Sequence, residues 1–402
     1  MSGLGEEPGE SSDTTGSSPA VTADDPAAGL PEDLADLDII VVRDPVDSGG
    51  GGIEVVADVA RFLDAPIYTY RQTEAVGAHQ ELEVNTFGPK DSLISQLARR
   101  FGLRRALTLF EINEYENWSP PREADIVVTV GTRSQHVIHH SHQQRIHFFF
   151  TPARWLWDLT HGQWDDWPRP VRRAMLAYAS HVRSLDISSS HRFDAVLAGS
   201  DLVKERVESY YGIDATVAYC PVDTFEFEHD PSEGHYVMLT RIVPEKRVKL
   251  VIDAFNELGL QLKIAGTPTG ASEEYAKECR QMAGGSIEFL GWVEGEEKRE
   301  LLAKSKALVF AAEHEDFGMP PVESMASGKP VVGVNEGYTQ HQIKDGENGY
   351  LFEPTHDSLV STIQRAERTQ WDAETVRQHA RQYDVRAVRR QWISTIRQII
   401  DR

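Results

Sequence analysis

The stretch that decides the fold runs from residue 307 to residue 332 and reads ALVFAAEHEDFGMPPVESMASGKPVV. Its first six residues are apolar and predict a buried strand, and the closing PVV begins a second strand. Pro320 and Pro321 suit the first turn of a helix between these strands, because that turn leaves its N–H groups unpaired. Gly328 is typical of a helix end. The stretch therefore predicts strand, loop, helix and strand, the repeating unit of a parallel α/β sheet.

The loop in this stretch carries candidate binding residues. Backbone N–H groups of Phe317, Gly318 and Met319 precede the helix, whose positive dipole end favours an anion such as a diphosphate. Glu323, which we place in the first turn of the helix, would repel phosphate, so its expected partner is the diol of a ribose. Glu315 is free to reach a sugar hydroxyl or the reacting centre. The alternative is a pair of surface carboxylates with a capping role.

A second charged motif, TRIVPEK, follows an earlier predicted strand, HYVMLT. Arg241 ends that strand, and Lys246 lies five residues later, before a helix. Two fixed cations at a strand end can hold a diphosphate and stabilise it as a leaving group. We expect the neighbouring Arg247 and Lys249 to be solvated. An ordinary charged loop is the alternative for the whole motif.

A glycine-rich motif, GGGGIE, follows the first predicted strand of the chain. Its Gly51 and Gly52 precede a helix, and a residue without a side chain lets the backbone come close to a ligand across a cleft. A flexible loop without a ligand is the alternative.

Short apolar runs alternate with amphipathic helical patterns over both halves of the chain. This alternation predicts two Rossmann-like, doubly wound α/β domains facing each other across a cleft, with ligands beyond the carboxyl ends of the strands. We place the N-terminal domain at residues 34–222, the C-terminal domain at residues 223–384 and a last helix at residues 385–402. Residues 1–33 are rich in Gly, Ser, Pro and acids, which predicts a disordered acidic tail.

Composition limits the partners and the location of the protein. The net charge of -22 argues against nucleic acid, because a polyanion would be repelled. The chain has 11 Lys and 30 Arg, and an acidic, lysine-poor surface fits a halophile with a high-salt cytoplasm. A GC-rich genome also favours Arg. No run of about 20 apolar residues and no signal peptide are found, so we expect a cytoplasmic protein, with the inner face of the cell membrane as a peripheral site.

Histidines and cysteines do not predict a metal centre. The segment HVIHHSHQQRIH contains His136, His139, His140, His142 and His147. Because no Cys or carboxylate is interleaved, we prefer a polar helix face to a metal site. Cys220 and Cys279 are too few for a disulfide framework and are expected to be buried.

Five motifs, EDFGMPPVE, TRIVPEK, GGIE, IEFLGWV and PVDTFEF, together resemble the family 4 glycosyltransferases of GT-B fold. The resemblance implies an N-terminal acceptor domain, a C-terminal domain that binds a nucleotide-diphosphate sugar, and a last helix that crosses back to the first domain. It also implies transfer with retention, without a metal or other cofactor. The donor-binding residues that it implies are Gly51, Gly52, Arg241, Lys246, Gly266, Trp292, Val293, Glu315, Phe317, Gly318, Met319 and Glu323.

The resemblance also implies roles within this set. Arg241 and Lys246 hold the diphosphate, Glu323 binds the ribose and Glu315 lies near the donor sugar. The catalytic candidates are Arg241, Lys246 and Glu315, and the stretch at Trp292 borders the base. The sequence offers no obvious nucleophile of the kind used by retaining hydrolases, so the leaving-group oxygen is the expected base.

One branch of the family, with mannosyltransferase-like members of surface-glycan synthesis, has a histidine before Thr-Pro, a basic residue and Trp-Asp. Here the segment reads FFFTPARWLWD, and Phe150 stands where the histidine is expected. The acceptor candidates in this segment are Arg154, Trp155, Trp157 and Asp158.

Residues 155–183, which begin within the same segment, are rich in Trp and Arg and suit a membrane interface or a lipid-linked acceptor, with a packed aromatic core as the alternative. The sequence thus predicts a retaining glycosyltransferase that moves a hexose from a nucleotide-diphosphate sugar to a glycan or lipid-linked glycan, in surface polysaccharide or glycoprotein glycan synthesis. The alternatives are a catalytically silent sugar-nucleotide-binding partner of a glycan assembly complex, a nucleotide-sugar epimerase and a phosphorylase.

Overall fold

The computed structural model describes the chain from residue 30 onward, with several gaps. The described residues are 30–45, 51–71, 82–88, 107–158, 160, 164–165, 167–269 and 272–401. Residues 1–29 of the predicted tail lie outside the described residues. Its last residues belong to the fold, because the 3-10 helix Glu32–Leu34 (η1) buries Leu34 and Asp33 pairs with Arg397 at 2.7 Å. The fold therefore begins before the predicted tail boundary at residue 33.

The first sheet is parallel and contains, within the described residues, seven strands in the order β3-β2-β1-β4-β5-β6-β7. The central β1 and β4 are buried along their whole length, as in sheets with helices on both faces. The strands are β1 (Ile39–Arg43), β2 (Ile67–Thr69), β3 (Val84–Thr86), β4 (Ile126–Val130), β5 (Gln144–Phe149), β6 (Ala195–Ala198) and β7 (Thr216–Val217). The helices are α1 (Gly51–Leu63), η4 (Ser134–His136), η5 (Arg154–Leu156), α3 (Thr108–Asn117), α4 (Arg169–Ser190) and α5 (Asp201–Tyr211).

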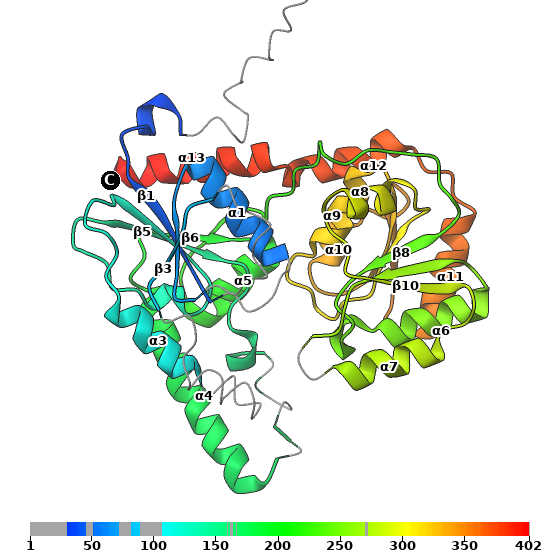
Figure 1. The fold of residues 1–402 in the computed structure, drawn as a ribbon, viewed down its shortest axis with the longest axis horizontal. Helices are drawn as coiled ribbons and strands as arrows, with labels where there is room; N and C mark the ends of the chain where they lie inside the picture. The colour runs from blue at the N-terminus through cyan, green and yellow to red at the C-terminus, as the bar shows by residue number, and fades with distance from the viewer. Residues whose placement is uncertain are drawn as a thin grey trace, which may run out of the picture.

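The second sheet is also parallel, with the order β10-β9-β8-β11-β12-β13 among the described residues. Figure 1 shows it beside the first sheet, with its own surrounding helices. Its strands are β8 (Tyr236–Leu239), β9 (Leu262–Ala265), β10 (Ile287–Gly291), β11 (Leu308–Phe310), β12 (Val331–Val334) and β13 (Gly349–Phe352). The helices are η6 (Pro244–Lys246), α6 (Val248–Leu258), α7 (Glu273–Met282), α8 (Gly295–Ala303), α9 (Met319–Ala326), α10 (Thr339–Gln342), α11 (His356–Glu367), α12 (Ala373–Ala380) and η7 (Arg381–Tyr383).

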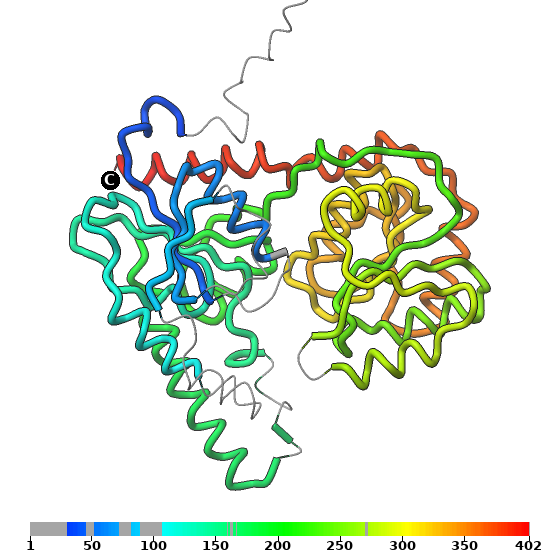
Figure 2. Tube along the Cα trace, viewed as in Figure 1, coloured from blue at the N-terminus to red at the C-terminus, as the bar shows by residue number. Residues whose placement is uncertain are grey.

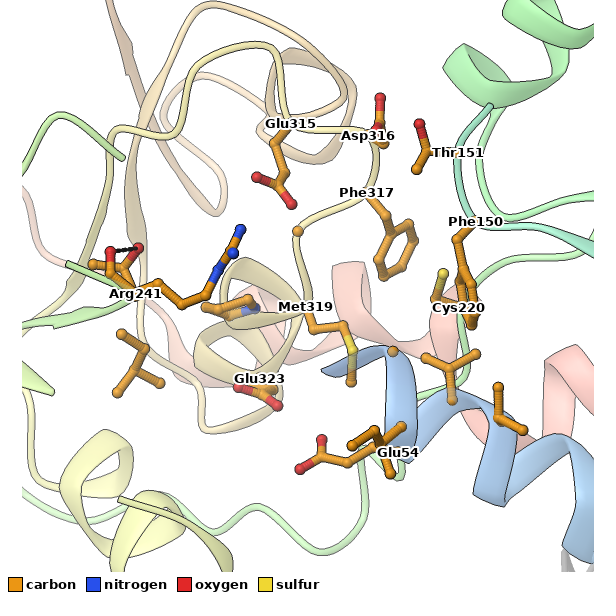
Figure 3. A pocket seen from close by; sticks show the side chains of 18 of the residues that line it. Glu54, Phe150, Thr151, Cys220, Arg241, Glu315, Asp316, Phe317, Met319 and Glu323 are labelled. Carbon is orange, nitrogen blue, oxygen red and sulfur yellow. Dashed lines mark hydrogen bonds between the residues drawn. The ribbon is translucent and has the colours of Figure 1, made fainter. Parts of the chain in front are cut away.

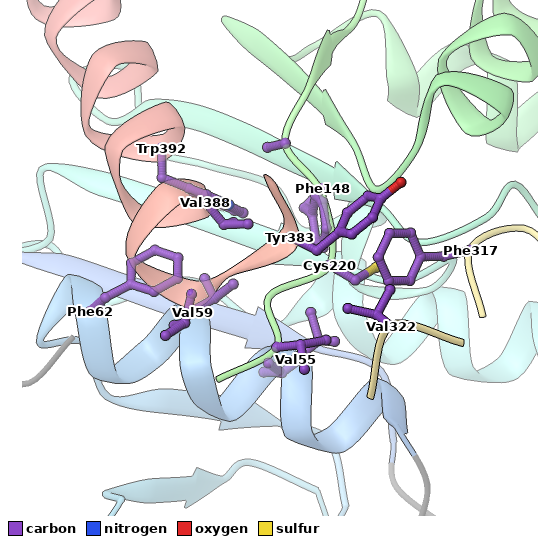
Figure 4. Close-up of a cluster of buried hydrophobic side chains, with 14 of the residues drawn as sticks. Val55, Val59, Phe62, Phe148, Cys220, Phe317, Val322, Tyr383, Val388 and Trp392 are labelled. Atoms are coloured by element: carbon purple, nitrogen blue, oxygen red, sulfur yellow. The ribbon is translucent and has the colours of Figure 1, made fainter. Parts of the chain in front are cut away.

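The last helix, α13 (Val385–Ile400), leaves the second sheet and packs on the first. The tube in Figure 2 follows this return of the red C-terminal segment to the blue N-terminal part of the chain. Trp392 of α13 is fully buried, with its ring 5.9 Å from Phe62 and 5.3 Å from Phe148. Figure 4 shows this cluster between α13 and α1. Burial of large aromatic side chains fixes the helix on the N-terminal domain.

The chain crosses between the two sheets twice, and the two crossings are hydrogen-bonded to each other. Val222 donates its N–H to the carbonyl of Tyr383 at 3.0 Å, and Val385 donates to the carbonyl of Val222 at 3.0 Å. Asp384 caps α13 and also accepts a hydrogen bond from the hydroxyl of Thr224 at 2.7 Å. The two connections therefore form one short, hydrogen-bonded joint.

The predicted polar helix face of histidines is wrong. His136 and His147 are buried, His147 lies on β5, and its Nδ1 is 2.8 Å from the hydroxyl of Thr129. The ring of His147 stacks on Phe193 at 4.9 Å, and His139 meets the same ring edge-on. Burial lowers the pKa of His136 to about 4 and the pKa of His147 to about 3. No group of metal-ligating side chains occurs among the described residues.

We predict that the protein loses stability between pH 6.5 and about pH 4. Over this range the unfolded chain binds protons at its histidines, whose ordinary pKa is about 6.5, while folded His136 and His147 stay neutral. As the pH falls through this range, each of the two histidines should lower the free energy of unfolding by about 1.4 kcal/mol per pH unit. Urea unfolding across this range should give a shallower pH dependence for His147→Gln and an unchanged one for the exposed His181→Gln. Equal slopes in all three proteins would contradict the prediction.

Candidate active site between the two sheets

A cavity of about 770 Å³ lies between the carboxyl ends of the two sheets. Its walls come from the loops after β1, β4 and β5 on one side, and after β8, β9 and β11 on the other. Figure 3 shows carboxylates, a guanidinium and aromatic rings converging on this space. Of the predicted donor-binding residues, these line the cavity: Gly52, Arg241, Lys246, Gly266, Trp292, Val293, Glu315, Phe317, Gly318, Met319 and Glu323. Gly51 is the first residue of α1, and its surroundings lie outside what the structure describes.

The loop before α9 has the geometry that an anion-binding helix start requires. Gly318 has φ +79°, and a Cβ there would lie 3.1 Å from the ring of Phe310, so a side chain would be strained. Helix α9 begins at Met319 with prolines in its first turn. The Phe317 ring is buried and stacks on Tyr338 at 5.8 Å, and this packing holds the loop in place. The N–H of Met319, the first residue of α9, lies at the cavity wall without an intrahelical partner, while Pro320 and Pro321 have no N–H to offer.

Glu323 lies just beyond the first turn of α9, and not within that turn as the sequence indicated. It is the fifth residue of the helix and only 4% exposed, and its Oε1 accepts from Nζ of Lys298 at 2.8 Å. Lys298 also lies 3.7 Å from Glu54, which belongs to α1 of the other domain. The expected repulsion between Glu323 and a phosphate is thus reduced by a buried counter-charge. Lys298, on α8, was missed because the acidic surroundings GEEKRE are typical of a solvated helix face.

Arg241 and Lys246 differ in how their charges are balanced. Lys246 forms an ion pair with Glu315, whereas the Arg241 side chain has no hydrogen bond or ion pair within the described part of the chain. In Figure 3 Arg241 extends into the space between Glu315 and Met319. An incoming anion would meet Arg241 directly but would have to compete with Glu315 for Lys246. The expected solvation of Arg247 is wrong, because this residue pairs with Glu336 at 2.8 Å.

Gly266 holds the loop that carries Arg241 in place. Its φ is +145°, and a Cβ would lie 1.7 Å from the carbonyl oxygen of Thr240. No side chain fits there, so the ends of β8 and β9 approach as closely as backbone permits. At the rim of the same wall, Trp292 is 48% exposed and donates to Glu294 at 2.8 Å. Val293 is buried beside it.

Phe150 lies in the cavity wall at the end of β5. Its ring meets Phe148 edge-on at 5.0 Å. Phe150 is half-buried, so part of the ring faces the cavity. An apolar ring thus occupies the place where the resemblance implies a histidine.

The four acceptor candidates do not line the cavity. Arg154 pairs with Asp158 at 2.9 Å and donates to the carbonyl of His314 at 3.1 Å, so it joins the N-terminal domain to the loop before Glu315. Trp157 stacks on Tyr210 at 4.8 Å, and Trp155 is half-buried. Arg154 supports the domain contact, whereas Trp155 and Trp157 pack within the N-terminal domain. A role of these four residues in acceptor binding stays a prediction.

Two residues that the sequence did not single out strengthen this contact. Arg206 of α5 forms an ion pair with Asp316, and Ser200 donates its hydroxyl to the carbonyl of Asp316 at 2.6 Å. Nothing local in the sequence indicates these pairs, since the partners are more than 100 residues apart. The loop that carries Glu315 is therefore held by both domains.

Comparison with known proteins agrees with this architecture. Residues 222–383 match the family described as Glycosyl transferases group 1. The C-terminal domain belongs to this family. The chain has the GT-B fold, and over 90% of its length it superposes on all of a solved structure of Anabaena HepE in complex with UDP, with TM-score 0.68 and 17% identity. A sucrose-phosphate synthase of Thermosynechococcus elongatus superposes with TM-score 0.66 and 15% identity, covering 90% of this chain and 99% of that one.

Curated relatives of the group 1 domain align over shorter stretches. The alpha-1,3/1,6-mannosyltransferase ALG2 of Dictyostelium discoideum is 28% identical over 152 residues, which cover 32% of this chain and 36% of that protein. The O-antigen chain mannosyltransferase RfbU of Salmonella typhimurium is 26% identical, covering 47% of this chain and 55% of that protein. These alignments span only about a third to a half of the relatives' own lengths.

We predict that Lys298→Met destabilises the protein by about 3 kcal/mol, because it leaves the Glu323 carboxylate buried without its cation. The double variant Lys298→Met/Glu323→Gln should recover most of this loss, since no charge is then left unpaired. The free energy of unfolding in urea measures both effects. A single variant as stable as the wild type would show that solvent, and not Lys298, balances Glu323.

Proposed function

We propose that the protein is a retaining glycosyltransferase that moves a hexose from a nucleotide-diphosphate sugar to a glycan or lipid-linked glycan. The observation that carries this proposal is the unpaired guanidinium of Arg241 near Met319, the first residue of α9 (Figure 3). A cation beside a helix N-terminus suits a diphosphate, because both favour negative charge. The names of two relatives, both mannosyltransferases, support hexose transfer, and the O-antigen relative supports a role in surface polysaccharide or glycoprotein glycan synthesis.

In the proposed chemistry, the positive charges of the protein stabilise the leaving group. Arg241, Lys246 and the start of α9 stabilise the departing diphosphate, whose negative charge grows as the bond to the sugar breaks. When the diphosphate engages Lys246, the Glu315 carboxylate is released and can accept a hydrogen bond from a sugar hydroxyl. The acceptor hydroxyl attacks from the face that the diphosphate leaves, with a diphosphate oxygen as base. Arg241 and Lys246 would fill this electrostatic role without a metal or a further cofactor.

Phe150 favours a second candidate function. A catalytically silent sugar-nucleotide-binding partner of a glycan assembly complex would keep Arg241 and α9 but would not need a polar side chain at position 150. Both candidates bind donor, and they differ in turnover. Slow hydrolysis of the bound donor by the purified protein supports the enzyme. Conversion of donor to another sugar nucleotide, without acceptor, would point instead to an epimerase.

We predict that Lys246→Ala lowers turnover of bound donor about tenfold or more, because a cation on a leaving group acts mostly in the transition state. A thermal-shift screen against UDP-, GDP- and dTDP-sugars first identifies the donor, which should stabilise the protein by about 2.7 kcal/mol at 100 times its dissociation constant. Lys249→Ala is the matched control, since Lys249 pairs with Glu278 outside the cavity. Wild-type turnover in Lys246→Ala, or no stabilisation by any donor, would refute the proposed role.

A peripheral membrane contact belongs to the same proposal, and α4 supports it. Its exposed first five residues include Arg169, Arg172 and Arg173, with Trp167 41% exposed just before them. In Figure 1 this end of α4 lies far from both sheets. Within the predicted Trp–Arg segment, Trp167 is exposed at this end, whereas Trp164 is in the core. No helix among the described residues is long and apolar enough to cross a membrane.

We predict that Arg173→Glu weakens binding to vesicles that contain phosphatidylglycerol by about tenfold or more, at roughly 1 kcal/mol for each basic charge near an anionic surface. Lys277→Glu on α7 is the control with the same charge change, and it should bind like the wild type. Flotation of the vesicles measures the bound fraction. In the high-salt cytoplasm that the acidic composition suggests, Trp167 would contribute more than the arginines. Equal flotation of all three proteins would exclude α4 as the contact.

A further inference from the structure

A second unpaired cation, Arg43, enters the cavity from the N-terminal domain. It is the last residue of β1, next to the centre of the first sheet, and it lines the cavity. It is only 9% exposed. Its guanidinium forms no hydrogen bond or ion pair with any residue that the structure describes. Arg43, nine-tenths buried and without a hydrogen-bond partner among the described residues, thus lines the space where we propose that a substrate lies.

The neighbouring carboxylate, Asp44, favours the charge of Arg43 but makes its own contacts elsewhere. Asp44 accepts the backbone N–H groups of Thr132, Arg133 and Ser134 at 2.8–2.9 Å. Its Oδ2 also lies 3.3 Å from the guanidinium of Arg133, which in turn binds Glu111 at 2.6 Å. Asp44 therefore ties the loop after β4 to the end of β1. Its carboxylate oxygens are occupied by these partners, so Asp44 acts on Arg43 only through its charge and forms no hydrogen bond with the guanidinium.

The physical state of Arg43 fits a ligand-binding role better than a structural one. Burial lowers the pKa of Arg43 to about 10, which still leaves it charged at neutral pH. A buried charge without a partner destabilises a fold, and such violations are expected at functional sites. Gly52, the second residue of α1, lines the same wall of the cavity. The N-terminus of a helix adds positive potential there. Glu54 in that first turn is engaged by Lys298 at 3.7 Å.

We propose that Arg43 binds an oxyanion of the acceptor, so that the acceptor substrate carries a phosphate or a carboxylate group. This inference rests on the proposed function, because it uses the donor site on the opposite wall. There Arg241 and the start of α9 are available for the donor diphosphate, whereas Arg43 comes from the other domain. Arginine takes phosphate and carboxylate groups in a bidentate manner, and a low-dielectric wall strengthens that contact. The four side chains first expected to hold the acceptor lie outside the cavity.

The test uses the full chain with its donor site filled. The protein is saturated with the nucleoside diphosphate that the donor screen selects, and inorganic phosphate is titrated in at constant ionic strength, followed by calorimetry. Acetate in a parallel titration distinguishes a carboxylate site from a phosphate site. We expect phosphate or acetate to bind to the wild type beside the nucleotide. Its affinity for Arg43→Met should be at least about tenfold lower. Arg241→Gln should keep oxyanion binding and lose nucleotide affinity.

Thermal stability separates a binding role from a structural one. Without ligand, Arg43→Met should melt at or above the wild-type temperature, because an unpaired buried charge is removed without loss of a partner. Nucleotide affinity should not change. The inference is overturned if oxyanion binding survives Arg43→Met, if nucleotide displaces the oxyanion completely, or if the variant melts well below the wild type. If no nucleotide binds the wild type, the proposed function fails, and the phosphate titration without nucleotide still tests Arg43.

Discussion

The cavity depends on the joint where the chain crosses twice between its domains. Two backbone hydrogen bonds link Val222 to Tyr383 and Val385, so the two segments that connect the domains are held together. The return places Trp392 between α1 and the first sheet. Because α13 is continuous with the joint, its buried ring fixes the orientation in which the carboxyl ends of the two sheets face each other. Every residue of the cavity takes its place from this arrangement.

The charges around the cavity follow a simple pattern. The buried or half-buried carboxylates have cations, as in the pairs Lys298–Glu323 and Lys246–Glu315. Two guanidinium groups, Arg241 and Arg43, are left over among the described residues, one on each wall. The protein carries a net charge of -22, yet its cleft offers unpaired positive charge. The lining as a whole contains more carboxylates than cations, so attraction of an anion depends on these two guanidinium groups and not on the net charge of the cavity.

The contact between the domains also explains why the acceptor candidates lie outside the cavity. Arg154 and Arg206 reach from the N-terminal domain to the loop of residues 313–318 and hold it through His314 and Asp316. The same loop carries Glu315 and leads into α9. This loop is therefore in contact with both domains and lies beside Lys246, which pairs with Glu315. The aromatic residues around Trp157 serve this support and form a packed core.

The sequence by itself determined both the α/β class and most of the cavity wall that we propose binds the donor. Strand, loop and helix at residues 307–332 are consecutive, so apolar periodicity, prolines and glycines encode that wall locally. Only the tertiary structure decided which charges are neutralised, since Lys298 meets Glu54 and Glu323 from three different helices. It also decided that Arg43 is buried and unpaired, which no spacing within IIVVR indicates. Ion pairing and burial depend on distances between segments remote in the chain, and a local pattern carries no information about those distances.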